Sequence, residues 1–108
     1  MPLDRTSVLA LARTHVSDDE WRGCVVSWDA TLRLRGADVA FGPVGHPMPF
    51  DGVVVFVDLQ PEANWSHPAR AVFIRADGGE THAFDVRFPP GTAPGASFQI
   101  LRTCTSPD

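Results

Sequence analysis

Four side chains that could do chemistry lie close together in the sequence, within the stretch from residue 58 to residue 68. They are Asp58, Asn64, Trp65 and His67. A histidine beside a carboxylate can act as a general acid or base. An exposed tryptophan is a favoured anchor in protein interfaces. Because loops on a rigid sheet commonly carry binding and catalytic residues, this stretch is the candidate site.

Each of these residues also has a purely structural interpretation. Asp58 follows a strand that we expect to be buried, so its carboxylate either caps backbone N–H groups of the next loop or points into a cleft with a shifted pKa. Asn64 could form a local turn, and Trp65 could cover the open end of the core. His67 could hydrogen-bond within a loop that the following proline holds extended. Polar loop residues often only satisfy backbone groups, which makes the structural role the commoner case.

Metal and cofactor chemistry find little support in the sequence. His46 is the other loop histidine, but about eight strand residues separate its loop from the one that contains His67, so the two loops begin at opposite ends of a strand. No HxH, HxxxH or CxxC spacing supplies a local pair of metal ligands. The pair Gly78-Gly79 lies in a predicted hairpin rather than between a strand and a helix, so it is no phosphate cradle. We therefore expect neither a metal nor a cofactor.

The composition excludes several classes of protein. The chain has 108 residues, 44% of them hydrophobic, and a formal net charge of −4. This length fits a single domain spanning residues 1–108 and is short for a two-domain enzyme with an enclosed cofactor. The arginines are spread along the chain rather than clustered, which argues against nucleic acid as a partner. The absence of lysine and tyrosine is typical of a GC-rich bacterial genome.

No membrane or export signal is evident. The longest apolar run is Val53–Val57, far short of the roughly 20 residues that a membrane helix needs. The N-terminus lacks a basic region followed by an apolar core, so we expect a cytoplasmic protein without a membrane partner. Cys24 and Cys104 could form one disulfide, but their apolar, strand-like surroundings in a reducing compartment are more typical of buried thiols.

The hydrophobic pattern predicts one short amphipathic helix followed by strands. Apolar residues recur with helical spacing over residues 6–16, and Ser17-Asp18-Asp19-Glu20 reads as a capping box that starts one more turn. A period of two then predicts a long strand, bent near Asp29. Further strands are expected at residues 39–41, 52–59, 69–76, 80–88 and 96–104, with loops at 42–51 and 60–68. The pair Asp77-Gly78 is a strong hairpin signal.

About six strands without intervening helices predict a mostly antiparallel fold. The five consecutive apolar residues from Val53 to Val57 leave no polar face, so this strand needs cover on both sides. We therefore expect an antiparallel two-layer β-sandwich with a short N-terminal α-helix. A curled sheet with the helix packed on it is the alternative.

Two classes of function fit this architecture. The first is a small binding or accessory module that presents the loop 60–68, or an exposed sheet edge, to a protein or peptide partner, a homodimer included. The second is a small hydrolase or isomerase in which His67 is the general acid or base and Asp58 is its partner. A purely structural subunit would use neither.

Overall fold

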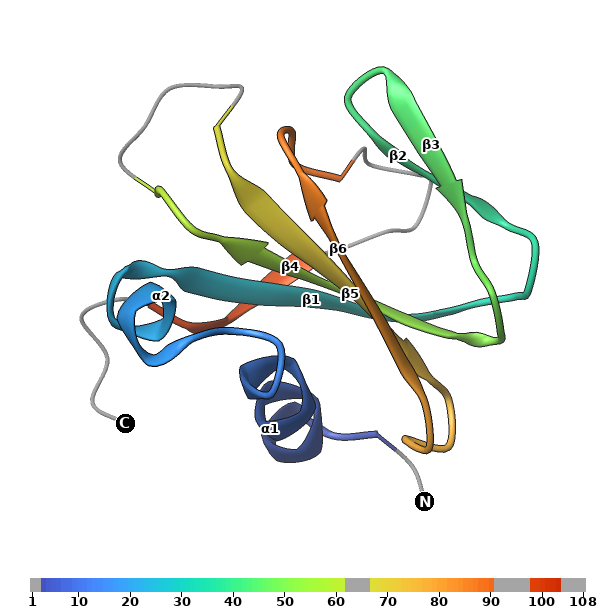
Figure 1. Ribbon diagram of the computed structural model, residues 1–108. Coiled ribbons are helices and arrows are strands. Elements are labelled where there is room, and N and C mark those ends of the chain that lie inside the picture. The colour runs from blue at the N-terminus through green and yellow to red at the C-terminus, as the bar shows by residue number, and fades with distance from the viewer. Residues whose placement is uncertain (1–2, 62–66, 91–97, 104–108) are drawn as a thin grey trace.

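The computed structural model describes residues 3–61, 67–90 and 98–103. Two helices precede seven strands in the described chain (Figure 1). The elements are α1 (Arg5–Arg13), α2 (Asp18–Gly23), β1 (Val25–Arg33), β2 (Asp38–Phe41), β3 (Val44–Pro47), β4 (Gly52–Asp58), β5 (Ala69–Arg75), β6 (Thr81–Val86) and β7 (Phe98–Arg102).

Five of the strands form one antiparallel sheet in the order β6-β5-β4-β1-β7. The other two, β2 and β3, pair as a separate antiparallel hairpin. The mostly β, antiparallel prediction is confirmed. The register between β1 and β4 shifts between Asp29 and Arg33, close to the position at which a bend was predicted.

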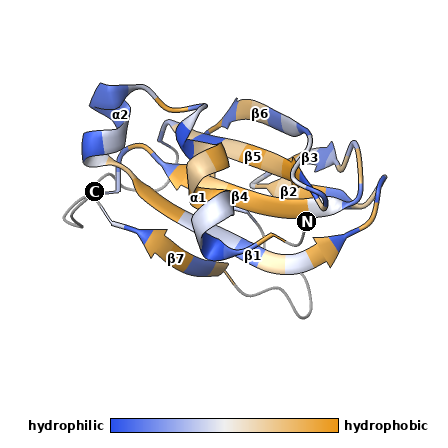
Figure 2. Ribbon diagram, turned by 90° about the horizontal axis from the view of Figure 1, so that it is seen from below, coloured by the Kyte–Doolittle hydropathy of each residue, from blue (hydrophilic) through white to orange (hydrophobic). Residues whose placement is uncertain are grey.

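Strand β4 lies at the centre of the sheet and is covered on both faces. Val53, Val55 and Val57 pack into the cluster that contains the buried residues of α1 and α2. Val54 and Phe56 point the other way, into a second cluster with residues of the β2–β3 hairpin and β5. Figure 2 views the sheet from the side of the helices, and α1 crosses in front of β4 and β5 there. The predicted double cover of this strand is therefore confirmed.

The two-layer sandwich is not confirmed. In the described part of the chain the second face of the sheet is covered by a two-stranded hairpin rather than by a full second sheet, and the first face by two helices. The expectation of an irregular loop over residues 42–51 was also wrong in part, because Val44–Pro47 forms β3 and pairs with Asp38–Phe41. An uninterrupted apolar strand needs cover on both faces, but its sequence does not indicate which elements provide that cover.

Capping groups start both helices. Asp4 accepts a hydrogen bond from the Ser7 backbone N–H and begins α1. Ser17 and Glu20 form the predicted reciprocal capping box of α2, with hydrogen bonds of 2.9 and 3.1 Å. Helix α2 places Trp21 in the core, between the guanidinium groups of Arg13 and Arg102 at 5.0 and 4.3 Å from its ring. These contacts tie the helical layer to β7. Within the described chain no helix is long and apolar enough to cross a membrane.

The central strand begins with a close backbone contact. A Cβ atom added to Gly52 would lie 2.2 Å from the carbonyl oxygen of Ile74 on β5. Because that neighbour is backbone within a ladder, the strand would have to move apart to accept a side chain. Glycine is thus required here by space rather than by its dihedral angles.

We predict that Gly52→Ala lowers the free energy of unfolding by about 1–3 kcal/mol, the usual cost of overpacking a core. Equilibrium urea denaturation measures the effect. Gly23→Ala is the matched control, since nothing lies within 4 Å of a Cβ added there. A Gly52→Ala protein as stable as the parent would contradict the close contact between β4 and β5.

Candidate functional site

The structure brings together two of the four predicted site residues, Asp58 and His67. Asp58 is the last residue of β4, and His67 comes two residues before β5. His67 Nε2 lies 2.8 Å from Asp58 Oδ1, with 12% and 23% of the respective side chains exposed. The pair therefore joins the two ends of the segment between β4 and β5.

Backbone contacts hold both partners in place. The Gln60 N–H donates to Asp58 Oδ1 at 3.1 Å, which is the capping role expected for this carboxylate. The His67 N–H donates to the carbonyl of Arg87 at 3.0 Å, just beyond the end of β6. Asp58 thus caps the chain and contacts an imidazole at the same time. A carboxylate bonded to one ring nitrogen fixes the tautomer and orientation of a histidine, as acid–base chemistry requires.

The other two predicted site residues, Asn64 and Trp65, lie outside the described residues. Their roles remain predictions. Cys104 lies outside them as well, so the disulfide with Cys24 is not tested, although Cys24 itself is fully buried.

His46 belongs to an aromatic cluster rather than to the pair formed by Asp58 and His67. It lies on β3, and its ring stacks on Phe84 of β6 at 4.1 Å between centroids. The Phe41 ring meets it edge-on, with 5.8 Å between the centroids. Among the described residues no group of three or more His, Cys, Asp or Glu side chains is arranged to hold a metal ion.

Sequence reasoning missed the role of Arg70. This residue shares the face of β5 that carries Val72 and Ile74, against the helices. Its terminal nitrogens donate to both oxygens of Glu20 at 2.9 and 3.1 Å, and its Nε donates to Asp85 at 2.8 Å. The available signal was an arginine in phase with apolar core residues, because a charge in such a position needs a partner. Arg70 thereby fixes α2 on β5 and β6.

A cavity of about 370 Å³ opens beside these ion pairs. Leu59 and Pro68, which flank the segment 60–67, form one wall of it. Arg70, Asp85 and Arg87 form another. The cavity is therefore continuous with both ends of the candidate site.

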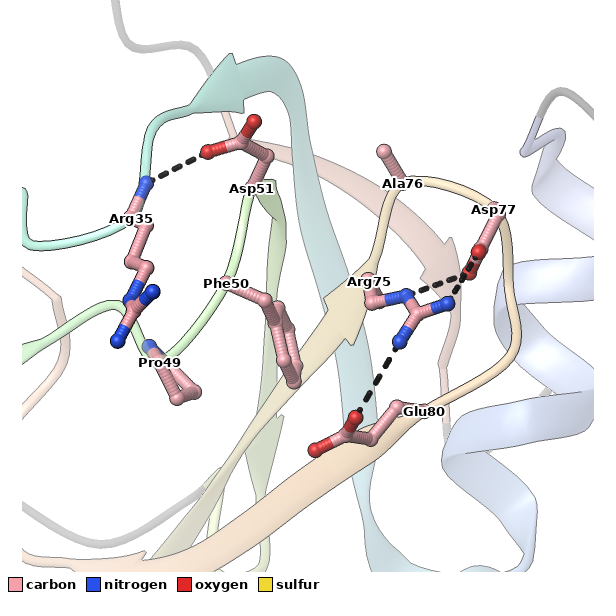
Figure 3. A pocket seen from close by; sticks show the side chains of 8 residues that line it. All are labelled: Arg35, Pro49, Phe50, Asp51, Arg75, Ala76, Asp77 and Glu80. Atoms are coloured by element: carbon pink, nitrogen blue, oxygen red, sulfur yellow. Dashed lines mark hydrogen bonds and ion pairs between the residues drawn. The ribbon is translucent and has the colours of Figure 1, made fainter.

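A cavity of about 480 Å³ lies at the opposite end of β4 and β5 (Figure 3). In that view the Arg75 guanidinium points to Asp77 and Glu80, and Phe50 lies between this group and Arg35. Gly52 pairs with Arg75 and Asp58 pairs with Ala69, so this cavity and the candidate site are a strand length apart. Neither Asp58 nor His67 lines it.

In comparisons with known proteins, the chain matches no protein family, no curated protein and no solved structure.

The Glu20–Arg70 pair makes stability depend on pH. Hydrogen bonds from Arg70 and from the Ser17 backbone N–H lower the pKa of Glu20 from 4.5 to about 2. A carboxyl whose pKa is lowered by folding stabilises the protein above its unfolded pKa, and that stabilisation is lost as pH falls toward the folded value.

We predict that Glu20→Gln lowers the free energy of unfolding at pH 7 by about 1–2 kcal/mol, after allowance for solvent screening of a partly exposed pair. The difference from the parent should shrink as pH falls from about 4.5 to 2. Urea denaturation at several pH values measures it. Asp19→Asn is the control, because the Asp19 side chain is 93% exposed and its ion pair is with Arg22 on its own helix. A difference independent of pH would contradict the ion pair.

Proposed function

We propose that the protein is a small binding module that presents residues 60–68 to a protein or peptide partner. The contact between Asp58 and His67 is the observation that supports this function. It ties the two ends of the segment together, and those ends belong to neighbouring strands of a sheet whose central strand is buried on both faces. Fixed ends reduce the conformational entropy that a binding loop loses when it engages a partner.

The partner side of this proposal rests on residue chemistry. Asn64 and Trp65 supply an amide and an indole to the same segment. Amphipathic aromatic side chains provide large contact areas at interfaces, and tryptophan is enriched among the residues that dominate binding energy. A second copy of the chain is the simplest partner of this kind, since most soluble oligomers are homo-oligomers.

We predict that Trp65→Ala weakens partner binding by at least about tenfold, as expected for an interface anchor. The partner is first identified by affinity purification of the tagged full chain from its own cells, and binding of the purified partner is then measured by calorimetry. Sedimentation velocity tests the homodimer in the same variants. Leu34→Ala is the matched control, because Leu34 is an apolar residue with 62% exposure outside the segment. Equal affinity of Trp65→Ala and the parent would overturn the proposal.

A second function is favoured by the same contact, namely acid–base catalysis of the hydrolase or isomerase type. An imidazole oriented by a carboxylate can take a proton from water or from a substrate carbon. His67 would act as the acid or base and Asp58 would orient its ring. The partial exposure of both side chains leaves the pair within reach of solvent.

We predict that, if this second function is correct, His67→Gln lowers the hydrolysis rate of p-nitrophenyl acetate by roughly a hundredfold. Asp58→Asn should lower it to a similar extent. His82→Gln controls for the background reactivity of surface histidines, because His82 is exposed on β6. Equal rates in the His67 and His82 variants would eliminate acid–base chemistry at this pair.

A further inference from the structure

Among the described residues, no strand pairs with the outer edge of β6. It is the outermost strand of the five-stranded sheet, as Figure 2 shows, and beyond its end only a single bridge links Pro90 to Phe41 of β2 in the described chain. The Arg75 N–H donates to the carbonyl of Glu80 at 2.9 Å. The register is then unbroken from Ile74↔Thr81 to Ala69↔Val86. Because hydrogen-bonded pairs alternate in an antiparallel ladder, the backbone groups of Thr81, Ala83 and Asp85 face outward.

The opposite edge of the sheet is different. On β7 the guanidinium of Arg5 donates to the carbonyl of Ile100 at 3.1 Å and approaches the Gln99 side chain at 3.4 Å. A charged side chain already occupies this edge, a common protection against strand pairing. The edge of β6 is therefore the better acceptor of an added strand.

Two cavities flank the same end of β6, and residues 85–87 line both of them. The cavity of about 370 Å³ beside Leu59 and Pro68 includes Arg70, which packs on the helix side of the sheet. The other cavity measures about 220 Å³ and lies against the β2–β3 hairpin. Side chains of an extended strand point alternately to the two faces of a sheet. Adjacent residues of an added strand would thus enter one cavity and then the other.

The smaller cavity is mainly apolar. Its walls include Phe41, Val44, His46 and Phe88. Val44 is 51% exposed at its margin. The turn of the hairpin is seated on Phe88, since a Cβ atom added to Gly42, at φ +64°, would lie 2.6 Å from that ring. This cavity suits an aliphatic or aromatic side chain.

The larger cavity is lined by charged side chains. Arg70 is shared between Glu20 and Asp85, so two carboxylates of this cavity pair with one guanidinium. The remaining cation, Arg87, has no ion-pair partner among the described residues. The formal charges of these four side chains sum to zero, and an acidic side chain placed beside Arg87 would give that guanidinium an ion-pair partner of its own.

We propose that β6 binds an extended peptide of a partner protein as a sixth strand, with an apolar side chain in the smaller cavity and an adjacent acidic side chain beside Arg87. Strand addition combines main-chain hydrogen bonds with pockets for alternate side chains, and both are present here. This inference names the class of partner for the binding module proposed above and rests on that function.

The test uses the full protein and a ten-residue peptide of alternating threonine and valine, with leucine-glutamate in place of the central pair. Site-resolved amide hydrogen exchange by NMR is the main measurement. In the free protein the amides of Ala83 and Asp85 should exchange faster than those of His82, Phe84 and Val86. Addition of the peptide should slow exchange at Ala83 and Asp85 at least about tenfold. Unchanged exchange at saturating peptide would overturn the proposal.

Variants at exposed positions test the roles of Arg87 and of the smaller cavity in peptide binding. Arg87→Glu should weaken the peptide by about fivefold and favour a peptide with lysine in place of glutamate. Arg35→Glu is the matched control, since Arg35 lies in the cavity at the other end of the sheet. Val44→Asp should weaken the leucine peptide, whereas Leu34→Asp should not. Equal effects of each variant and its control would contradict the assigned cavities.

The outcomes separate this inference from the function on which it rests. Partner binding that is lost in Trp65→Ala without protection of Ala83 and Asp85 would overturn strand addition and leave the binding module intact. Protection of the two amides that rises with protein concentration in the absence of peptide would identify a second copy as the occupant and overturn the partner peptide. Partner binding unaffected by Trp65→Ala would overturn the proposed function of the segment.

Discussion

The burial of β4 on both faces is the constraint on which the rest of the structure depends. Five consecutive apolar residues, Val53–Val57, cannot face water on either side, and burying each contributes roughly 1.5–3 kcal/mol relative to exposure. The neighbouring strands of the sheet lie beside β4 and cannot cover its two faces. The chain therefore places α1 and α2 on one face and the β2–β3 hairpin on the other. The contact of Arg70 with Glu20 holds the first of these layers in position.

This constraint also explains why the candidate site lies where it does. Asp58 is the first polar residue after the apolar run, at the point where cover ends and solvent begins. Its carboxylate is three-quarters buried, so it needs hydrogen-bond donors, and His67 and the Gln60 N–H supply them. The same bonds fix the ends of the following segment. The hydrogen bonds that satisfy the Asp58 carboxylate are therefore also the ones that orient the candidate site residues.

The sequence predicts the parts of the fold that repeat locally. Alternation predicted β6, the Asp77-Gly78 pair predicted the hairpin that joins it to β5, and the Ser17–Glu20 box predicted α2. It could not predict β3, because Val44–Pro47 is rich in glycine and proline and lacks a buried face, so only pairing with β2 makes it a strand. The contact of Asp58 with His67 was foreseen as one option. The bond of Arg70 to Glu20 spans 50 residues, and no local pattern encodes it.

The two edges of the sheet, β6 and β7, differ because charged side chains are placed differently along them. Arg5 covers β7, whereas Asp85 on β6 turns its carboxylate to Arg70 within its own sheet. Satisfying Asp85 in this way removes it from the outer edge as a repelling charge, although its side chain remains 77% exposed. Among the residues that the structure describes, Arg87 is then the cation at that end of β6 without an ion pair. In the proposed complex, Arg87 is thereby the cation that an acidic side chain of the added strand would meet.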